Sequence, residues 1–373
     1  MSYASVSGHR TMALDAVRNE AYAAALRQVV VADSVVMDLG AGTGIHGLMA
    51  ARLGARRVYL VEPEDILAVA EEIVHVNGLQ HTVRCLHGRL EDVELPERVD
   101  VLVSALTGNF LLTEDLLQTL FHARDRALKP GGVLIPSAAT MEAVPVSAPA
   151  VHEKEIAAWS VPQHGIDLSP ARSYAANSML FRVDGLRDLA FLAEPQTLAT
   201  LDFHRDDYST VQADVSYEIT ESGVCHGWVG WFSMKLGDRW VSTSPRADAV
   251  HWSPAFLPVD PPVVFEKGER VSFALSRAPF GDWTWKMRSA STTRRHSTLL
   301  SGPMKASTLK KASLEYVPSL NPEGHALTHV LSRCNGSMTM QSIADTLHEE
   351  HPERYRSAAE ALRFVQAIVK RHA

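Results

Sequence analysis

The sequence predicts an α/β protein: a doubly wound parallel sheet, then an antiparallel β-barrel, then a small winged-helix-like domain. Three observations lead to this prediction. A short apolar run over residues 35–39 ends at a glycine-rich turn. Strand-like and helix-like segments then alternate as far as residue 137, which is typical of a parallel sheet. From residue 138 to about 290, short β-type runs separated by turn residues favour an antiparallel barrel or sandwich.

The elements of the predicted sheet can be followed along the first 137 residues. Apolar residues recur at helical spacing over 11–31, so we expect one helix there. A second helix is expected over 113–128, closed by the Lys-Pro-Gly-Gly of 129–132. Strands are expected at 35–39, 57–62, 82–86, 99–103 and 133–136. In the β-rich region, strands are expected at 143–146, 227–232 and 270–275, with an excursion out of the sheet at 153–178.

The turn after the first strand carries the most specific motif of the chain. Gly40, Gly42 and Gly44 form Gly-x-Gly-x-Gly, and Ile45 stands where a dinucleotide fingerprint needs its last glycine. No lysine follows, as a P-loop would require. S-adenosylmethionine (SAM) fits better, because its zwitterionic amino-acid end needs a carboxylate and a close backbone rather than a phosphate cradle.

Three acidic residues follow one another at the ends of expected strands. Asp38 belongs to the first strand, Glu62 ends the second, and Glu91 follows the third. An acid in the position of Glu62 meets ribose hydroxyls in sheets of this kind, and Glu91 could accept a hydrogen bond from an adenine amino group. The alternative is that the glycines form only a tight turn and the acids only cap helices. Three acids in this order favour a Rossmann-like SAM-binding domain.

Length and composition restrict the class of function. A chain of 373 residues is long enough for two or three domains. Its net charge of −7 argues against nucleic acid as the main partner. Without an apolar run of membrane-spanning length or a basic-then-apolar N-terminus, we expect a cytoplasmic protein with no membrane partner. Its three cysteines are far apart and no His-Glu-x-x-His pattern occurs, so neither disulfides nor a metal is expected.

The region from residue 291 onward differs from the rest of the chain. It begins as a Ser/Thr-rich basic stretch, and residues 314–317 then resemble a strand. Helices are expected over 326–334, 340–350 and 358–372. One strand and three helices predict a small winged-helix-like domain. Such domains can bind nucleic acid, but the acidity of the whole chain disfavours this function.

Residues 1 to about 290 resemble the protein arginine methyltransferase family. The positions that bind the cofactor in that family are matched here by Tyr3, His9, Met12, Arg18, Asp38, Gly40, Gly42, Glu62 and Glu91. The first four match its cofactor-covering helix, and the resemblance implies that Arg18 pairs with the cofactor carboxylate. The excursion at 153–178 takes the place of the family's dimerisation arm, which implies a homodimer. We therefore expect a SAM-binding domain (1–137), a barrel domain (138–290) and a third domain (291–373).

A loop after the fourth strand resembles the loop that carries two catalytic glutamates in this family. Glu114 retains the second glutamate, whereas Ala105 stands in place of the first. Asn109 replaces an aromatic residue, and Val250 replaces the threonine of a Thr-His-Trp motif whose histidine is His251. The resemblance implies that Glu114 and His251 are catalytic. The alternatives are a solvent-facing acid in the first turn of a helix and a core histidine.

The missing glutamate determines the predicted substrate. A planar guanidinium is held by two carboxylates, so Ala105 favours a smaller amine that Glu114 alone orients or deprotonates, with His251 orienting the nucleophile. The tail resembles a PqqD-like recognition element, which binds a leader peptide as an added strand. We therefore expect an N-methyltransferase that acts on an amine of a ribosomally synthesised peptide (RiPP maturation), as in daptide-type pathways, with the precursor peptide as partner.

Several alternatives stay open on sequence alone. One is an arginine N-methyltransferase that acts on a free amino acid or a protein, with a different acid in place of the one missing at Ala105. Another is a catalytically silent SAM-binding scaffold that gathers a peptide for partner enzymes. An O-methyltransferase acting on a small metabolite is a further alternative. The tail itself could be a helical cap with a packing role only.

Overall fold

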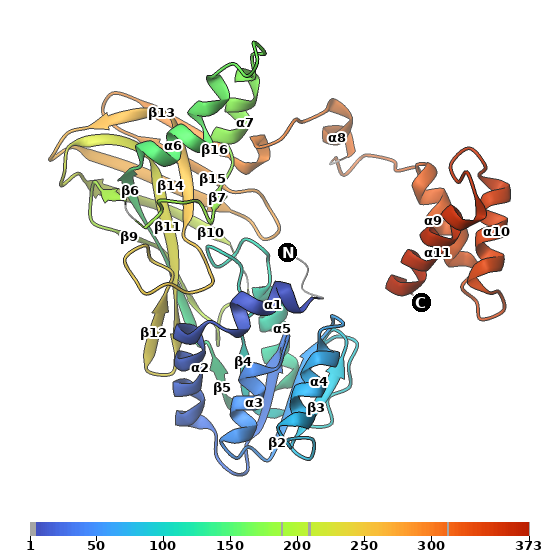
Figure 1. Ribbon diagram of the computed structural model, residues 1–373. Coiled ribbons are helices and arrows are strands. Elements are labelled where there is room, and N and C mark those ends of the chain that lie inside the picture. The colour runs from blue at the N-terminus through green and yellow to red at the C-terminus, as the bar shows by residue number, and fades with distance from the viewer. Residues whose placement is uncertain (1–4, 188, 208–209, 312, 373) are drawn as a thin grey trace. The chain divides into compact units, whose positions relative to one another are not determined.

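The computed structural model describes residues 5–187, 189–207, 210–311 and 313–372. Contacts within the chain divide it into two compact units, Met1–Pro303 and Met304–Ala373 (Figure 1). The parallel sheet and the β-rich region both belong to the first unit. In the described part of the chain, every helix is too short or too polar to cross a membrane.

A five-stranded parallel sheet forms the first part of unit one, as the sequence predicted (Figure 1). Its strand order is β3-β2-β1-β4-β5. The strands are β1 (Val35–Leu39), β2 (Arg57–Glu62), β3 (Val83–His87), β4 (Val99–Ser104) and β5 (Leu128–Ile135). The order reverses between β1 and β4, and a ligand binds such a sheet at the carboxyl ends of the strands beside the reversal.

The N-terminal segment forms two helices, whereas the sequence predicted one over residues 11–31. Helix α1 spans Val6–Ala13 and helix α2 spans Ala16–Val29. The break lies at Asp15, whose Oδ1 accepts a hydrogen bond of 3.0 Å from the backbone N–H of Arg18 and so caps α2. The helices α3 (Ile45–Arg52), α4 (Leu67–Val76) and α5 (Leu117–Ala127) connect the strands of the sheet.

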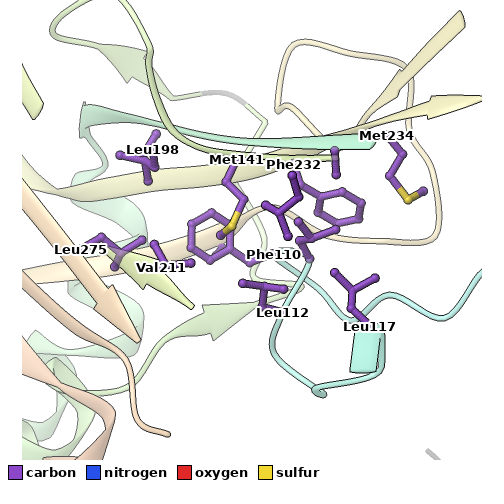
Figure 2. Packing of buried hydrophobic residues seen from close by; sticks show 14 of the residues in the cluster. Phe110, Leu112, Leu117, Met141, Leu198, Val211, Phe232, Met234 and Leu275 are labelled. Atoms are coloured by element: carbon purple, nitrogen blue, oxygen red, sulfur yellow. The ribbon is translucent and has the colours of Figure 1, made fainter. Parts of the chain in front are cut away.

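The helix predicted over 113–128 begins only at Leu117, because the preceding residues form a tight loop. Phe110 and Leu111 have φ of +49° and +63°, a region that side chains rarely adopt, and both are fully buried. Figure 2 shows Phe110 among apolar side chains of the β-rich region, including Phe232 and Met141. Core packing therefore holds this loop in place. After α5 the chain enters β5 directly, so residues 129–132 are strand rather than turn.

The β-rich region consists of two antiparallel sheets and confirms the predicted barrel-like domain. One sheet has the order β10-β14-β15-β16, and the other has β7-β13-β11-β6-β8, with β9 on β6 and β12 on β11. The stacked rings of Trp228 and Phe273, 4.6 Å apart, join the two sheets. The strands are β6 (Ala138–Ser147), β7 (Leu180–Phe181), β8 (Ala190–Phe191), β9 (Gln196–Asp202), β10 (Val211–Glu218), β11 (Gly223–Leu236), β12 (Arg239–Ser242), β13 (Ala255–Phe265), β14 (Arg270–Arg277), β15 (Thr284–Arg288) and β16 (Thr293–Ser297).

A helical arm leaves the barrel where the sequence predicted an excursion. It contains α6 (Pro149–Glu155), α7 (Arg172–Ala176) and two 3-10 turns between them. Asp260 on β13 anchors the arm, since its carboxylate accepts two hydrogen bonds from Arg172, of 2.7 and 3.0 Å, and contacts His152 Nε2 at 3.0 Å.

Unit two contains helices α8 (Ala306–Lys311), α9 (Pro322–Arg333), α10 (Met340–Glu350) and α11 (Ala358–His372). Helices α10 and α11 span the predicted residues. Helix α9 begins earlier than predicted, because Asn321 caps it by accepting a hydrogen bond of 2.7 Å from the N–H of Gly324. The predicted strand at 314–317 is absent: Leu314 and Val317 are exposed, and no strand occurs among the described residues of this unit. The winged-helix-like fold is therefore not confirmed.

Candidate active site

A cavity of about 630 Å³ lies at the carboxyl edge of the parallel sheet, within the usual size range for small-ligand sites. Its cofactor end is formed by helices α1 and α2 and by the residues that follow β1, β2 and β3. Its acceptor end includes Ala105, Asn109, Glu114, Arg182 and His251. Nine of the predicted site residues line the cavity: His9, Met12, Arg18, Gly40, Gly42, Glu62, Glu91, Glu114 and His251. Tyr3 lies outside the described residues.

The glycine turn needs glycine for steric reasons. Gly40, Gly42 and Gly44 have φ of +67°, +55° and +79°, which side-chain-bearing residues rarely adopt. A Cβ on Gly42 would lie 2.7 Å from the ring of His9, and one on Gly40 would lie 2.6 Å from Leu106. The turn therefore brings backbone to the cavity surface at the place where the sequence predicted it.

Glu62 holds the glycine turn and faces the cavity as well. Its two carboxylate oxygens accept hydrogen bonds from the backbone N–H of Gly42 (2.8 Å) and of Glu64 (3.0 Å). Burial raises the pKa of Glu62, although these two hydrogen bonds oppose the rise. Each carboxylate oxygen keeps a further lone pair, which suits a ribose hydroxyl. Glu91 lies on the exposed rim of the same end.

Asp38 supports the cofactor end from below and is absent from the cavity lining. Its side chain is buried, and Oδ2 accepts a hydrogen bond of 2.8 Å from the N–H of Gly47 in the first turn of α3. Burial raises the pKa of Asp38 to about 7, with Glu62 adding to the rise and the Gly47 hydrogen bond opposing it. The structure thus places Asp38 to fix α3 beneath the glycine turn.

Arg18 is a buried cation, and one of its N–H groups has no hydrogen-bond partner among the described residues. Its Nη2 donates to the carbonyl of Met12 (2.6 Å) and to Asn19 Oδ1 (3.3 Å), and its guanidinium lies 5.7 Å from the centre of the Trp252 ring. Burial lowers the pKa of Arg18. Its Nε is buried and has no hydrogen-bond partner among the described residues. An unsatisfied buried donor is costly, so the site fits a ligand carboxylate such as that of SAM.

His251 and Asp15 form a buried pair in the acceptor end. Asp15 Oδ2 accepts a hydrogen bond of 2.8 Å from the backbone N–H of His251 and lies 3.2 Å from its Nδ1. Burial would raise the pKa of Asp15, but hydrogen bonds from His251 and from the backbone of Arg18 outweigh it, and the pKa is lowered. Burial lowers the pKa of His251 and Asp15 opposes this, with a net lowering. At neutral pH a charged Asp15 therefore orients a neutral His251.

Glu114 extends from the tight loop, which is tied to the barrel on both sides. On one side, Asn109 Oδ1 accepts a hydrogen bond of 2.9 Å from the N–H of Ser253. On the other side, Asp115 pairs with Arg277 of β14 and accepts a hydrogen bond of 3.0 Å from the N–H of Phe280. Burial would raise the pKa of Asp115, but the interaction with Arg277 lowers it overall. These contacts fix the backbone that carries Glu114 into the cavity.

The charges of the acceptor end are mixed. Ala105 contributes no charge, and Glu114 is the carboxylate among the residues that define this end. Arg182 adds a positive charge, which contributes to lowering the pKa of His251. Its backbone N–H donates to Ser253 Oγ (2.9 Å). This end can therefore accept a proton or a hydrogen bond at Glu114, but it lacks the two-carboxylate clamp.

Three lining or supporting residues were given no role by the sequence analysis. Asp15 had a local signal, since an acid that interrupts a helical pattern is a good N-cap, but its partner His251 is far along the chain. Arg182 belongs to a segment without a clear pattern. His46 stacks on Tyr22 with the rings 4.1 Å apart, and its Nε2 has no partner among the described residues. Burial keeps the pKa of His46 well below its usual value.

The fold and the site together define a SAM-dependent methyltransferase. Two family models match, a methyltransferase domain over residues 36–132 and an arginine methyltransferase oligomerization subdomain over 137–288. Protein arginine N-methyltransferase 6 of Xenopus laevis is 30% identical over 290 residues, which cover 74% of this chain and 85% of the relative. The probable enzyme of the same name from Arabidopsis thaliana is 36% identical over 243 residues, 63% of this chain and 55% of the relative.

Solved structures of arginine methyltransferases have the same fold as this chain. The Trypanosoma brucei PRMT1 enzyme-prozyme complex with AdoHcy has a TM-score of 0.71 at 24% identity, and covers 80% of this chain and 99% of its own. A crystal structure of PRMT6 has a TM-score of 0.61 at 21% identity, with 76% and 100% covered. The chain belongs to the protein arginine methyltransferase family, and the predicted cofactor, SAM, is confirmed.

The comparisons also correct the predicted function. The sequence favoured methylation of a peptide amine in RiPP maturation, but the relatives are named arginine methyltransferases, so that prediction is wrong. The argument from Ala105 gave too much weight to one side chain of the acceptor end. The resemblance of the tail to a PqqD-like or daptide-type element stays a prediction, and unit two offers no strand among its described residues to which a precursor peptide could add.

Proposed function

We propose that this protein is an arginine N-methyltransferase that acts on a protein or peptide. The observation that carries the proposal is one cavity lined both by Arg18 with the glycine turn and by Glu114 with His251. In this proposal residues 1–137 bind the cofactor, residues 138–290 complete the acceptor end and carry the arm, and residues 291–373 form an additional helical domain.

Each residue of the cofactor end has a role in the proposal. SAM, when bound, supplies an electrophilic methyl group. The unused Nε of Arg18 donates to the cofactor carboxylate. Glu62 accepts from the ribose hydroxyls, and Glu91 accepts from the adenine amino group at the rim. His9 and Met12 cover the cofactor, and the resemblance to the family assigns the same role to Tyr3, which lies outside the described residues.

The acceptor end would activate the guanidinium nitrogen. Glu114 accepts a hydrogen bond from the substrate and thereby concentrates electron density on the nitrogen that attacks. His251 is held neutral beside Asp15, so its other ring nitrogen is free of positive charge and can accept a hydrogen bond or a proton. Because Ala105 provides no second carboxylate, the guanidinium is held from one side only, and we expect a high KM for arginine substrates.

Mass spectrometry of reaction products tests the proposal. Purified protein, SAM and arginine-rich peptides should yield methylarginine, while the same peptides with every arginine replaced by lysine should stay unmodified. Methylation of lysine or of the peptide N-terminus instead would contradict arginine as the acceptor. Free arginine, run in parallel, separates an amino-acid substrate from a polypeptide one.

Ala105 favours a second candidate function, a SAM-binding subunit without catalysis of its own. The absence of half the carboxylate clamp is the observation behind it. In that case SAM binds with full affinity and no peptide is methylated. Any turnover on a cognate peptide excludes this candidate.

We also propose that the protein forms a homodimer through its arm. The arm exposes apolar side chains, with Trp159 at 41%, Val161 at 51% and Ile166 at 63% of their surface. An apolar groove of about 350 Å³ lies on the sheet domain, lined mainly by residues of α2, α3 and α4. A symmetric pair of molecules would let each arm cover its partner's groove. Trp159→Glu should give monomers by sedimentation, whereas Trp240→Glu, at an exposed tryptophan outside the arm, should stay dimeric.

A further inference from the structure

Two histidines and a glutamate converge in unit two. His329 lies near the end of α9, Glu350 is the last residue of α10, and His351 follows it. Their ligand atoms all lie within 4.8 Å of one another. His329 Nδ1 is 3.0 Å from a carboxylate oxygen of Glu350. We call these three residues the His-Glu-His cluster.

The contacts of His329 allow a tautomer in which Nδ1 carries no hydrogen and faces the carboxylate of Glu350. His329 Nε2 lies 3.1 Å from Thr346 Oγ1, and the hydroxyl of Thr346 donates to the carbonyl of Ile343 (2.9 Å). A hydroxyl has one hydrogen, so Thr346 can accept a hydrogen bond from an N–H at Nε2 of His329. In that tautomer the lone pair of Nδ1 and a carboxylate oxygen of Glu350 face one another, and a cation between them can bind to both.

We propose that the His-Glu-His cluster binds a divalent transition-metal ion, with Zn²⁺ as the best match. Imidazole nitrogens and a carboxylate oxygen are preferred zinc ligands, and three protein ligands with one open position form a common zinc site. The hydrogen bond to Thr346 fixes the ring of His329 with Nδ1 toward the site, which is how metal-binding histidines are usually oriented.

The surroundings allow a cation at this position. The site lies at the C-terminal end of α10, where the helix dipole favours positive charge. Glu353 Oε1 lies 3.7 Å from His351 Nδ1 and adds negative charge beside the cluster. The positive charge of Arg333 disfavours a second cation nearby. However, Arg333 donates its hydrogen bond of 3.1 Å to Oε1 of Glu350, whereas Oε2 faces His329. The carboxylate therefore has one oxygen for each positive group.

A metal here would join the end of α9 to the end of α10. Unit two has a small core, formed by nine buried residues of α9, α10, α11 and the segment before α11. Small domains gain proportionately more from a metal cross-link than large ones do. Because metal binding is coupled to folding, the expected effect is a zinc-dependent gain in the stability of unit two, independent of methyl transfer.

Zinc titration of the full-length, chelator-treated protein tests the proposal. Calorimetry should show one saturable equivalent of Zn²⁺ that is weakened at least about tenfold by Glu350→Gln and by His351→Gln. Both residues lie at the helix end rather than in the core, and circular dichroism checks that the variants stay folded. His325→Gln, at an exposed histidine of the same helix as His329, is the matched control and should bind zinc normally.

Each outcome of the titration either supports or overturns the proposed zinc site. Loss of the same equivalent in both ligand variants and its retention in His325→Gln supports the site, as does a zinc-dependent rise in the unfolding temperature that both variants abolish. Absence of saturable zinc binding in the unmodified protein overturns the proposal. So does normal binding in either ligand variant, since the proposed site needs all three ligands.

Discussion

The two ends of the cavity are built in different ways. At the cofactor end, the contacts come from consecutive strand ends of one sheet, and the backbone of the glycine turn forms part of the surface. At the acceptor end, the residues come from a tight loop, from the end of the arm region and from the barrel. Parts far apart in the sequence must meet to form that end.

This difference explains which end departs from the family pattern. A change in the glycine turn meets steric limits, as at Gly42, where a Cβ would collide with His9. A change at Ala105 alters a side chain in a loop whose backbone is held elsewhere, by Asn109 and by the pair of Asp115 and Arg277. Side chains on a loop held by a rigid scaffold can vary without loss of the fold. The backbone thus determines the shape of the cofactor end, whereas side chains determine the chemistry of the acceptor end.

If the cofactor end and the acceptor end act separately, substitution of Glu114 should have the largest effect on the rate of methyl transfer. Glu114→Gln should lower methyl transfer by roughly 100-fold or more, because the amide cannot accept a proton from the substrate. SAM affinity, measured by calorimetry, should be unchanged. Glu91→Gln is the reciprocal control and should weaken SAM binding with turnover kept at saturating SAM. Normal turnover of Glu114→Gln would remove this residue from the mechanism.

Arg18 should have the next largest effect, at the cofactor end. Arg18→Gln removes a charge-assisted hydrogen bond and should weaken SAM binding by about 10- to 100-fold. Arg182→Gln, which removes a positive charge from the acceptor end, should leave SAM affinity unchanged. If both variants lose SAM binding equally, the division of the cavity into two ends is wrong.

The same division separates what the sequence could predict from what it could not. Local patterns were sufficient for β2, for α10 and α11, and for the glycine turn, where an apolar run or glycine spacing determines the backbone. The tight loop before α5 was missed because a partner distant in the sequence stabilises it. The break at Asp15 was missed although its cap on the N–H of Arg18 is local, and a distant partner holds this side chain as well. His251 holds Asp15, and Arg277 holds Asp115.

The tail and the substrate show a second kind of error. Residues 314–317 have strand-like composition, but unit two offers no described strand with which they could pair, and a strand needs a neighbour. The substrate was inferred from Ala105 and from the resemblance of the tail to a peptide-recognition element. Nine of eleven predicted site residues nevertheless line one cavity. The sheet fixes those that follow its strands, whereas the resemblance to a family supplied those on α1, α2, the tight loop and the barrel.

Restoring the missing carboxylate should sharpen the comparison of the two ends. Ala105→Glu places a second acid in the acceptor end, and two carboxylates should hold a guanidinium more tightly than one. We expect KM for an arginine peptide to fall by about tenfold, the value of one charge-assisted hydrogen bond, with SAM affinity unchanged. Ala105→Gln, which has similar size and no charge, is the matched control. Equal KM values for the two variants would show that charge at this position is unimportant.

The smallest effect is expected in the pH dependence, and it concerns the contact between α2 and the acceptor end. Asp15 opposes the burial that lowers the pKa of His251. In Asp15→Asn the side chain can still cap α2, but the pKa of His251 should fall further. If turnover needs neutral His251, the acid limb of kcat/KM moves to lower pH, because the ring stays neutral over a wider range. A pH–rate profile measures the shift, with Asp33→Asn, at an exposed aspartate outside the cavity, as control. An unmoved acid limb would mean that Asp15 acts only as a helix cap, and the acceptor end would then depend on Glu114 alone.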